Sequence, residues 1–168
     1  LVGDHGEAMW EYHELDRQFS DSRPNYCVGH GGTPFDKLAR VPAALYHPNR
    51  ESNLLFSGQP NGRDIPRTIC EGLGIDSTIF KGEDWFEGIP EDRYSICEAT
   101  RYGTERKAVY YKDKKIIHSK TDDVTLDATV GPDGETFGTL STDTIESLLE
   151  HLPEKWDSFD MKSDASAM

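Results

Sequence analysis

Two histidines in this sequence are enclosed by glycines, in Gly3-Asp4-His5-Gly6 and in Gly29-His30-Gly31-Gly32. Carboxylate oxygens and imidazole nitrogens both bind divalent metal ions, and glycine lets the backbone approach an ion without a Cβ in the way. We therefore predict that Asp4 and His5 are metal ligands. A lone Asp-His-Gly is more often a plain turn, because Asp and Gly are common turn residues. The second glycine-enclosed histidine favours the metal hypothesis.

The elements that would position these residues are short strands. Leu1-Val2 before Asp4 predicts the end of a buried strand that opens into the crevice beyond a sheet edge. Such a strand usually brings roughly four to eight apolar residues, so we expect the chain to be a fragment of a longer protein. After His30, the apolar residues 43–46 predict a second strand.

The order of the motifs resembles a known family. The chain carries Asp4-His5-Gly6-Glu7, a loop, Gly29-His30-Gly31-Gly32, then Phe35-Asp36-x-Leu38-x-Arg40-Val41-Pro42 and a probable strand. This order is similar to the second half of sulfatases, members of the alkaline phosphatase superfamily. The resemblance extends over Leu1 to about Ile75, and beyond that only the order of elements is similar.

The resemblance has implications for fold and site. It implies an α/β fold, the C-terminal part of an alkaline-phosphatase-like mixed sheet with helices, followed by a small antiparallel sheet and a C-terminal helix. Asp4 and His5 then match a pair of metal ligands, and His30 matches a catalytic, substrate-binding group that faces the ester oxygens or the leaving group. A carboxylate favours calcium, magnesium or manganese as the metal, and imidazole shifts the preference toward manganese or zinc.

The family's nucleophile is not found in this sequence. Sulfatases use a formylglycine made from the first residue of Cys/Ser-x-Pro-x-Arg, and none of Cys27, Cys70 and Cys97 lies in that motif. In the family this motif and an Asp-Asp pair of metal ligands precede the Asp-His-Gly strand. The resemblance thus implies a fragment of a metal-dependent sulfuric ester hydrolase, inactive alone. Its substrate would be a small-molecule or saccharide ester of sulfate or phosphate.

Other functions stay open on the residues alone. Lys37 stands where the family often carries an acid, and the loop before His30 is longer than usual. A phosphodiesterase, a phosphonate ester hydrolase or a phosphoglycerol transferase of the same superfamily would share this half and differ in its nucleophile. A degenerate member without a nucleophile and a non-catalytic binding module are further alternatives.

Composition limits the partners. The 168 residues suffice for one domain with a core, or for one and a half small ones. The formal net charge of −13 makes binding to nucleic acid or to an anionic membrane by bulk electrostatics unexpected. No apolar run approaches the ~20 residues that cross a bilayer. Three widely spaced cysteines predict a reducing, cytoplasmic setting without a disulfide framework or a structural zinc site.

Patterning divides the chain into four segments. They are residues 1–76, 77–92 (connecting loop), 93–156 (small antiparallel sheet and helix) and 157–168 (frayed tail). The resemblance implies that residues 1–76 are the C-terminal part of a sulfatase-like catalytic α/β domain. Helices are predicted over 8–19 and from Asp64 to Gly74, and strands over 54–57, 94–99, 107–111, 115–119, 124–130 and 136–137. A last helix is predicted after a cap at Ser141 or Thr142, ending by Pro153.

Overall fold

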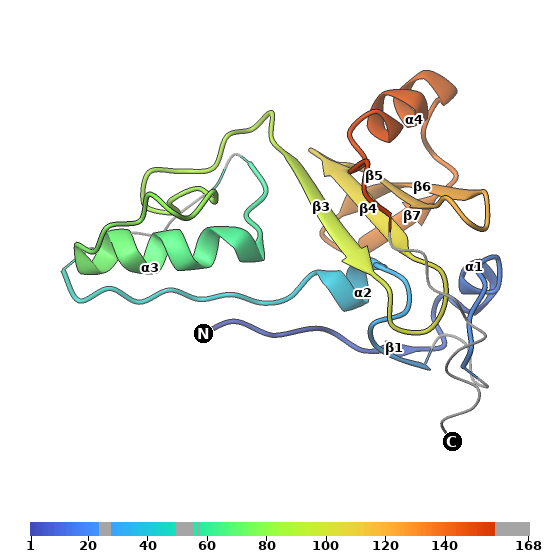
Figure 1. Cartoon of the computed structure of the whole chain (residues 1–168), viewed down its shortest axis with the longest axis horizontal. Helices are drawn as coiled ribbons and strands as arrows, with labels where there is room; N and C mark the ends of the chain where they lie inside the picture. The colour runs from blue at the N-terminus through green and yellow to red at the C-terminus, as the bar shows by residue number, and fades with distance from the viewer. Residues whose placement is uncertain (24–27, 50–55, 57, 157–168) are drawn as a thin grey trace. The chain divides into compact units, whose positions relative to one another are not determined.

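The computed structural model describes residues 1–23, 28–49, 56 and 58–156. These residues form a mixed α/β structure with one two-stranded and one five-stranded sheet, in agreement with the predicted fold class (Figure 1). They group into two compact units, Leu1–Ala43 together with the residues from Ile96 onward, and Ala44–Ser95. The predicted tail 157–168, and the predicted strand 54–57 apart from Phe56, lie outside the described residues.

The five-stranded sheet confirms the predicted strands of the second half. Its strands are β3 (Tyr94–Ala99), β4 (Arg106–Tyr111), β5 (Lys114–Ser119), β6 (Val124–Gly131) and β7 (Gly134–Phe137), in the order β3-β4-β5-β6-β7. The strands β4 to β7 pair antiparallel through short turns. Lys112 (φ 55°) and Gly134 (φ 117°) take the left-handed conformation that these tight turns require. Sequential hairpins thus build the sheet from local signals.

The last helix, α4 (Thr142–Leu149), also confirms its prediction. Ser141 is the N-cap, and its side chain accepts a hydrogen bond from the backbone N–H of Thr144. This bond satisfies one of the N–H groups left free at a helix start. Leu148 is buried at 2% exposure, and α4 packs beside β4 and β5. The helix ends at Leu149, before Pro153.

The helix predicted over residues 8–19 is wrong for most of its length. Ala8–Met9 forms strand β1 instead, which pairs antiparallel with β2 (Val28–Gly29). Trp10 has φ 76°, a left-handed conformation that no α-helix can contain. Only the four residues of α1 (His13–Asp16) are helical.

The two strands predicted beside the histidine motifs are not formed as buried strands. Val2 makes one isolated antiparallel bridge, with Ala43. Leu1 and Val2 are 97% and 46% exposed, and Tyr46 is exposed as well. The single Val2–Ala43 bridge joins the two segments, but their large apolar side chains stay exposed, so neither segment is a buried strand.

An aromatic core attaches the segment with the histidine motifs to the five-stranded sheet. Tyr12, Phe19 and Phe35 are buried against one cluster of sheet residues, Ala108, Tyr110, Ile117 and Leu126. The rings of Tyr12 and Phe35 stack with centroids 4.1 Å apart. Burying each such side chain stabilises the fold by about 1.5–3 kcal/mol. Tyr12 follows the first motif and Phe35 the second, so this core anchors both.

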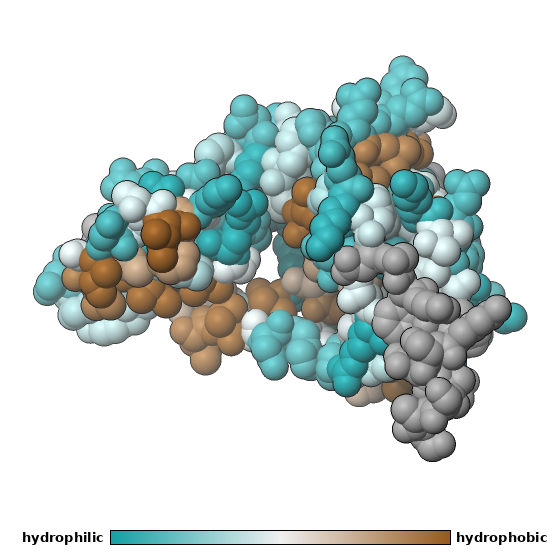
Figure 2. Space-filling model, in the orientation of Figure 1, coloured by the Kyte–Doolittle hydropathy of each residue, from teal (hydrophilic) through white to brown (hydrophobic). Residues whose placement is uncertain are grey.

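The unit Ala44–Ser95 contains the 3₁₀ turn η1 (Gly62–Asp64) and helix α3 (Ile65–Leu73). The predicted helix is confirmed, and Gly74 ends it with φ 68°. Asp64 stands at the N-cap position of α3, but its side chain makes no cap bond to that helix and is buried in other contacts. Ile69 and Leu73 are 48% and 67% exposed, and apolar surface is visible over this unit (Figure 2).

Candidate metal centre

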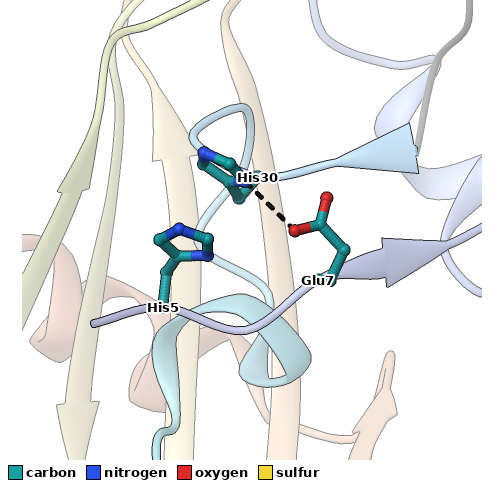
Figure 3. Close-up of side chains that lie close together, drawn as sticks. All are labelled: His5, Glu7 and His30. Carbon is teal, nitrogen blue, oxygen red and sulfur yellow. Dashed lines mark hydrogen bonds and ion pairs between the residues drawn. The ribbon is translucent and has the colours of Figure 1, made fainter. Parts of the chain in front are cut away.

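Pairing of β1 with β2 brings the two histidine motifs together. His5 precedes β1 and His30 directly follows β2, with Ala8 opposite Gly29 in the register. The two imidazole rings stack, with centroids 3.7 Å apart and planes 23° from parallel (Figure 3). The structure therefore places both predicted histidines at one point on the surface, although they are separated in sequence by the loop before β2.

Glu7 is the third member of this group. The Nδ1–H of His30 donates a hydrogen bond to Glu7 Oε2 over 3.1 Å (Figure 3). Potential ligand atoms of His5, Glu7 and His30 all lie within 4.8 Å of one another, so small side-chain shifts would bring them to the ~2.1 Å bond lengths of one ion. Glu7 belongs to the sequence motif but was not predicted as a ligand. We call these three residues the His5–Glu7–His30 group.

Asp4, predicted as a ligand, lies beside the group but not within it. Its side chain is 89% exposed, with Oδ2 3.6 Å from Nε2 of His5, and its Oδ1 accepts the backbone N–H of His5. This backbone hydrogen bond is the main cause that lowers the pKa of Asp4, so its carboxylate is charged at neutral pH. Asp4 therefore adds negative charge next to His5.

The hydrogen bonds of His5 leave one nitrogen available. Its Nδ1 lies 2.9 Å from the carbonyl oxygen of Gly6. A carbonyl oxygen only accepts, so Nδ1 carries the proton and Nε2 keeps its lone pair when the ring is neutral. A histidine that binds a metal through one ring nitrogen usually donates its other ring N–H to an acceptor, which holds the ring in the orientation needed for binding.

Arg101 contacts the group from the loop between β3 and β4. Its Nη1 donates to His30 Nε2 over 2.8 Å, and its backbone N–H donates to the carbonyl oxygen of Gly31. Gly31 has φ 81°, and a Cβ there would lie 2.9 Å from Arg101 Cδ, so this close approach requires glycine. Sequence reasoning missed Arg101, because it lies in no motif and 71 residues from His30.

Gly6 sets the distance between the first motif and helix α2 (Asp36–Ala39). Its N–H donates to the carbonyl oxygen of Leu38 over 2.9 Å. A Cβ on Gly6 would lie 1.7 Å from the carbonyl oxygen of Lys37, which is backbone and cannot turn away. The motif therefore rests directly on α2.

Substitution Gly6→Ala should move this segment and disturb the site. We expect a loss of about 1–3 kcal/mol in the free energy of unfolding, because backbone must shift to admit the methyl group. Urea unfolding at neutral pH measures it. The control is Gly62→Ala, where a Cβ meets nothing within 4 Å. Equal stability of the two variants would contradict the close packing of Gly6 on α2.

The donor set of the group fits a divalent metal ion. Nε2 of His5 with the carboxylate of Glu7, and a second carboxylate on Asp4 nearby, suit manganese or zinc better than magnesium or calcium, which prefer oxygen ligands throughout. Both ring nitrogens of His30 are engaged, by Glu7 and by Arg101. The site is half-exposed: the side chains of His5, His30 and Glu7 are 41%, 34% and 43% exposed. An ion and a small anionic ligand can reach it from solvent.

Comparisons of the chain with protein-family models, with curated proteins and with solved structures find no match. The likeness to sulfatases therefore rests on the order of motifs alone. As for membranes, none of the helices in the described residues has the length and apolar character that a crossing requires.

Proposed function

We propose that this chain supplies part of the centre of a metal-dependent sulfuric ester hydrolase of the sulfatase type, and that it is inactive alone. The observation that carries the proposal is the His5–Glu7–His30 group, which assembles two motifs that occur in the sulfatase order. Its substrate would be a small-molecule or saccharide sulfate ester. The cysteine usage, with Cys70 and Cys97 free, favours a cytoplasmic setting.

Each residue has a role in this proposal. Hydrolysis of such an ester requires that charge on the non-bridging oxygens be neutralised and that the leaving alkoxide be protonated. His5 and Glu7, with Asp4 beside them, would hold a divalent ion, which when bound withdraws negative charge from those oxygens. His30 would face the leaving group, oriented by its hydrogen bond to Glu7.

Arg101 would provide the fixed positive charge. Its guanidinium bonds His30 Nε2, and guanidinium groups bind the oxygens of a tetrahedral anion through two parallel N–H bonds. An anion that takes this bond from Arg101 would free Nε2 of His30. Once it is protonated, that nitrogen would give its proton to the leaving alkoxide, while Nδ1–H stays bonded to Glu7. The same contacts suit a phosphate ester, which is why the phosphate-cleaving relatives stay as the second candidate.

The nucleophile must come from another part of the protein in this proposal. No Cys/Ser-x-Pro-x-Arg motif occurs in the 168 residues. Residues encoded before Leu1 in the gene test the class of ester. A Cys/Ser-x-Pro-x-Arg motif with an Asp-Asp pair supports the sulfatase, and a Thr in the nucleophile's place supports a phosphate-cleaving enzyme.

Metal binding by this chain tests the site itself. We expect one Mn²⁺ or Zn²⁺ ion to bind per chain in isothermal titration calorimetry. His5→Ala and Glu7→Gln should each weaken binding at least about tenfold, because each removes one ligand. The control is His13→Ala. His13 is also paired with an acid, Glu14 at 3.0 Å, and its side chain is 35% exposed, but it lies outside the group.

Two outcomes would count against the metal site. One is the absence of measurable binding to the unaltered chain, which would favour a binding module whose histidines fill glycine turns. The other is an equal loss of affinity in His13→Ala and His5→Ala, which would show that the ions bind acidic surface without selecting the group.

A further inference from the structure

A cavity of about 400 Å³ lies beside α2, and none of the His5–Glu7–His30 group lines it. It is lined by Glu11 and Tyr12, by Asp36, Lys37 and Arg40, and by residues 132–135, which span the turn between β6 and β7 and the start of β7. All of these segments belong to the unit that carries the five-stranded sheet. The proposed hydrolase function assigns this cavity no role.

Two buried carboxylates of the cavity wall, Asp36 and Glu135, are bound to the ammonium of Lys115, which does not itself line the cavity. Lys115 is fully buried, and its Nζ donates to Asp36 Oδ1 over 3.0 Å and to Glu135 Oε1. Asp36 is 4% exposed, and the side chain of Glu135 is fully buried. Tyr110 also donates its hydroxyl to Asp36 Oδ1, over 3.0 Å. Negative charge exceeds positive charge in this buried set.

The second oxygen of Asp36 is unsatisfied. Oδ2 is buried and has no hydrogen-bond partner among the described residues. It forms an ion-pair contact with Arg40 Nη1, but at 3.8 Å this is too long for a hydrogen bond, and that nitrogen donates to the carbonyl oxygen of Gly131 instead. A buried carboxylate oxygen without a donor is costly, so the geometry calls for a donor from outside the chain.

We propose that this cavity binds a primary ammonium group, which donates a hydrogen bond to Oδ2 of Asp36. An ammonium group brings three N–H donors and the positive charge that this wall lacks. Four acidic residues line the cavity: Glu11, Asp36, Asp133 and Glu135. They outnumber the basic residues Lys37 and Arg40 even when the nearby Lys115 is added, and this excess of negative charge disfavours an anionic ligand.

A metal ion is a poorer occupant than an ammonium group. Among the described residues, the set of three side chains whose ligand atoms are close enough to hold an ion is His5, Glu7 and His30, and none of these lines the cavity. Simple amines and amino sugars both carry such a group, and the chemistry at Oδ2 is the same for both. The inference does not depend on the proposed function, since the two sites share no ligand residue.

Backbone NMR of the whole chain tests the proposal, with the amides of Gly131 and Gly134 as reporters of the cavity wall. The probes are ethanolamine and glucosamine, compared with ethylene glycol and glucose at equal pH and ionic strength. Tetramethylammonium provides the charge without an N–H donor. We expect saturable shifts from the two primary amines and none from the other three compounds. A stronger effect of glucosamine would identify an amino sugar, and a stronger effect of ethanolamine a simple amine.

Three variants make the test specific. Asp36→Asn should weaken amine binding about tenfold, because it removes the charge of the accepting group. Asp133→Asn, on the exposed turn, should weaken it about twofold by reducing the negative potential. Asp143→Asn on α4, which does not line the cavity, should leave it unchanged. If Asp36→Asn does not fold, Asp133→Asn decides. The proposal is overturned if the amines cause no shift, if glucose matches glucosamine, or if Asp143→Asn weakens binding as much as Asp133→Asn.

Discussion

Lys115→Met will lower the free energy of unfolding by about 3–5 kcal/mol, the usual loss when one partner of a buried ion pair is removed. Lys115 is fully buried between Asp36 and Glu135, and without its ammonium both carboxylates stay in the core with no cation that donates to them at this point. Methionine fills similar space, so the loss reports charge and not volume. Urea unfolding at pH 7, followed by far-ultraviolet circular dichroism, measures it.

Two further variants separate charge from other causes. Lys114→Met changes the neighbouring residue, whose side chain is 39% exposed and 3.8 Å from Asp113, and should cost less than about 1 kcal/mol. The double variant Lys115→Met with Glu135→Gln should regain at least about 1 kcal/mol over the single one, because one stranded charge is gone. A loss in Lys115→Met no greater than that in Lys114→Met would contradict the buried ion pair.

The sequence predicted the parts of this fold whose causes are local. Each hairpin of β4 to β7 is marked by β-branched and aromatic residues and a short polar turn, and Ser141 and Gly74 are local cap signals. The helix over 8–19 was wrong because its apolar spacing suited a helix, while pairing of Ala8–Met9 with β2 requires partners distant in sequence. Pairing between strands that are distant in sequence overrides the local preference for a helix. A single sequence does not reveal which distant segments pair.

The site was predictable to the same extent. Residue types and flanking glycines identified His5 and His30, and the β1–β2 pairing that joins them was not foreseen. Glu7 joins the group because β1 runs on from its motif, and Arg101 arrives through a loop that only the folded sheet brings near. The two sequence motifs thus contain His5, Glu7 and His30. Arg101, the positively charged residue of the site, is added only by tertiary packing.

Asp64→Asn will destabilise the unit Ala44–Ser95 by about 3 kcal/mol, because it breaks a buried pair. Asp64 is fully buried and accepts two hydrogen bonds from Arg93 at 2.8 Å, plus the backbone N–H groups of Asn61 and Glu83. One carboxylate therefore joins the turn before α3, the loop after it and the segment before β3. The NMR resonances of Trp85, which lies in this unit, report its unfolding in urea.

The same carboxylate makes this unit sensitive to acid. Burial alone would raise the pKa of Asp64, but the hydrogen bonds from Arg93, Asn61 and Glu83 outweigh it, so the pKa in the folded state lies below its usual value. A lowered folded-state pKa means that the contribution is fully present above the unfolded-state value of about 4 and is lost as pH falls through the folded-state value.

The unit Ala44–Ser95 of the wild-type chain should therefore lose stability below about pH 4. In Asp64→Asn, the free energy of unfolding of this unit should change less with pH over the same range. Asp76→Asn is the matched control: a hydrogen bond from Thr78 also lowers the pKa of Asp76, but that carboxylate is fully exposed, so its loss should leave the profile nearly unchanged. A profile in Asp64→Asn as steep as in the wild type would mean that other carboxylates govern acid unfolding. The bonds to Arg93 would then stabilise the unit by packing rather than by charge.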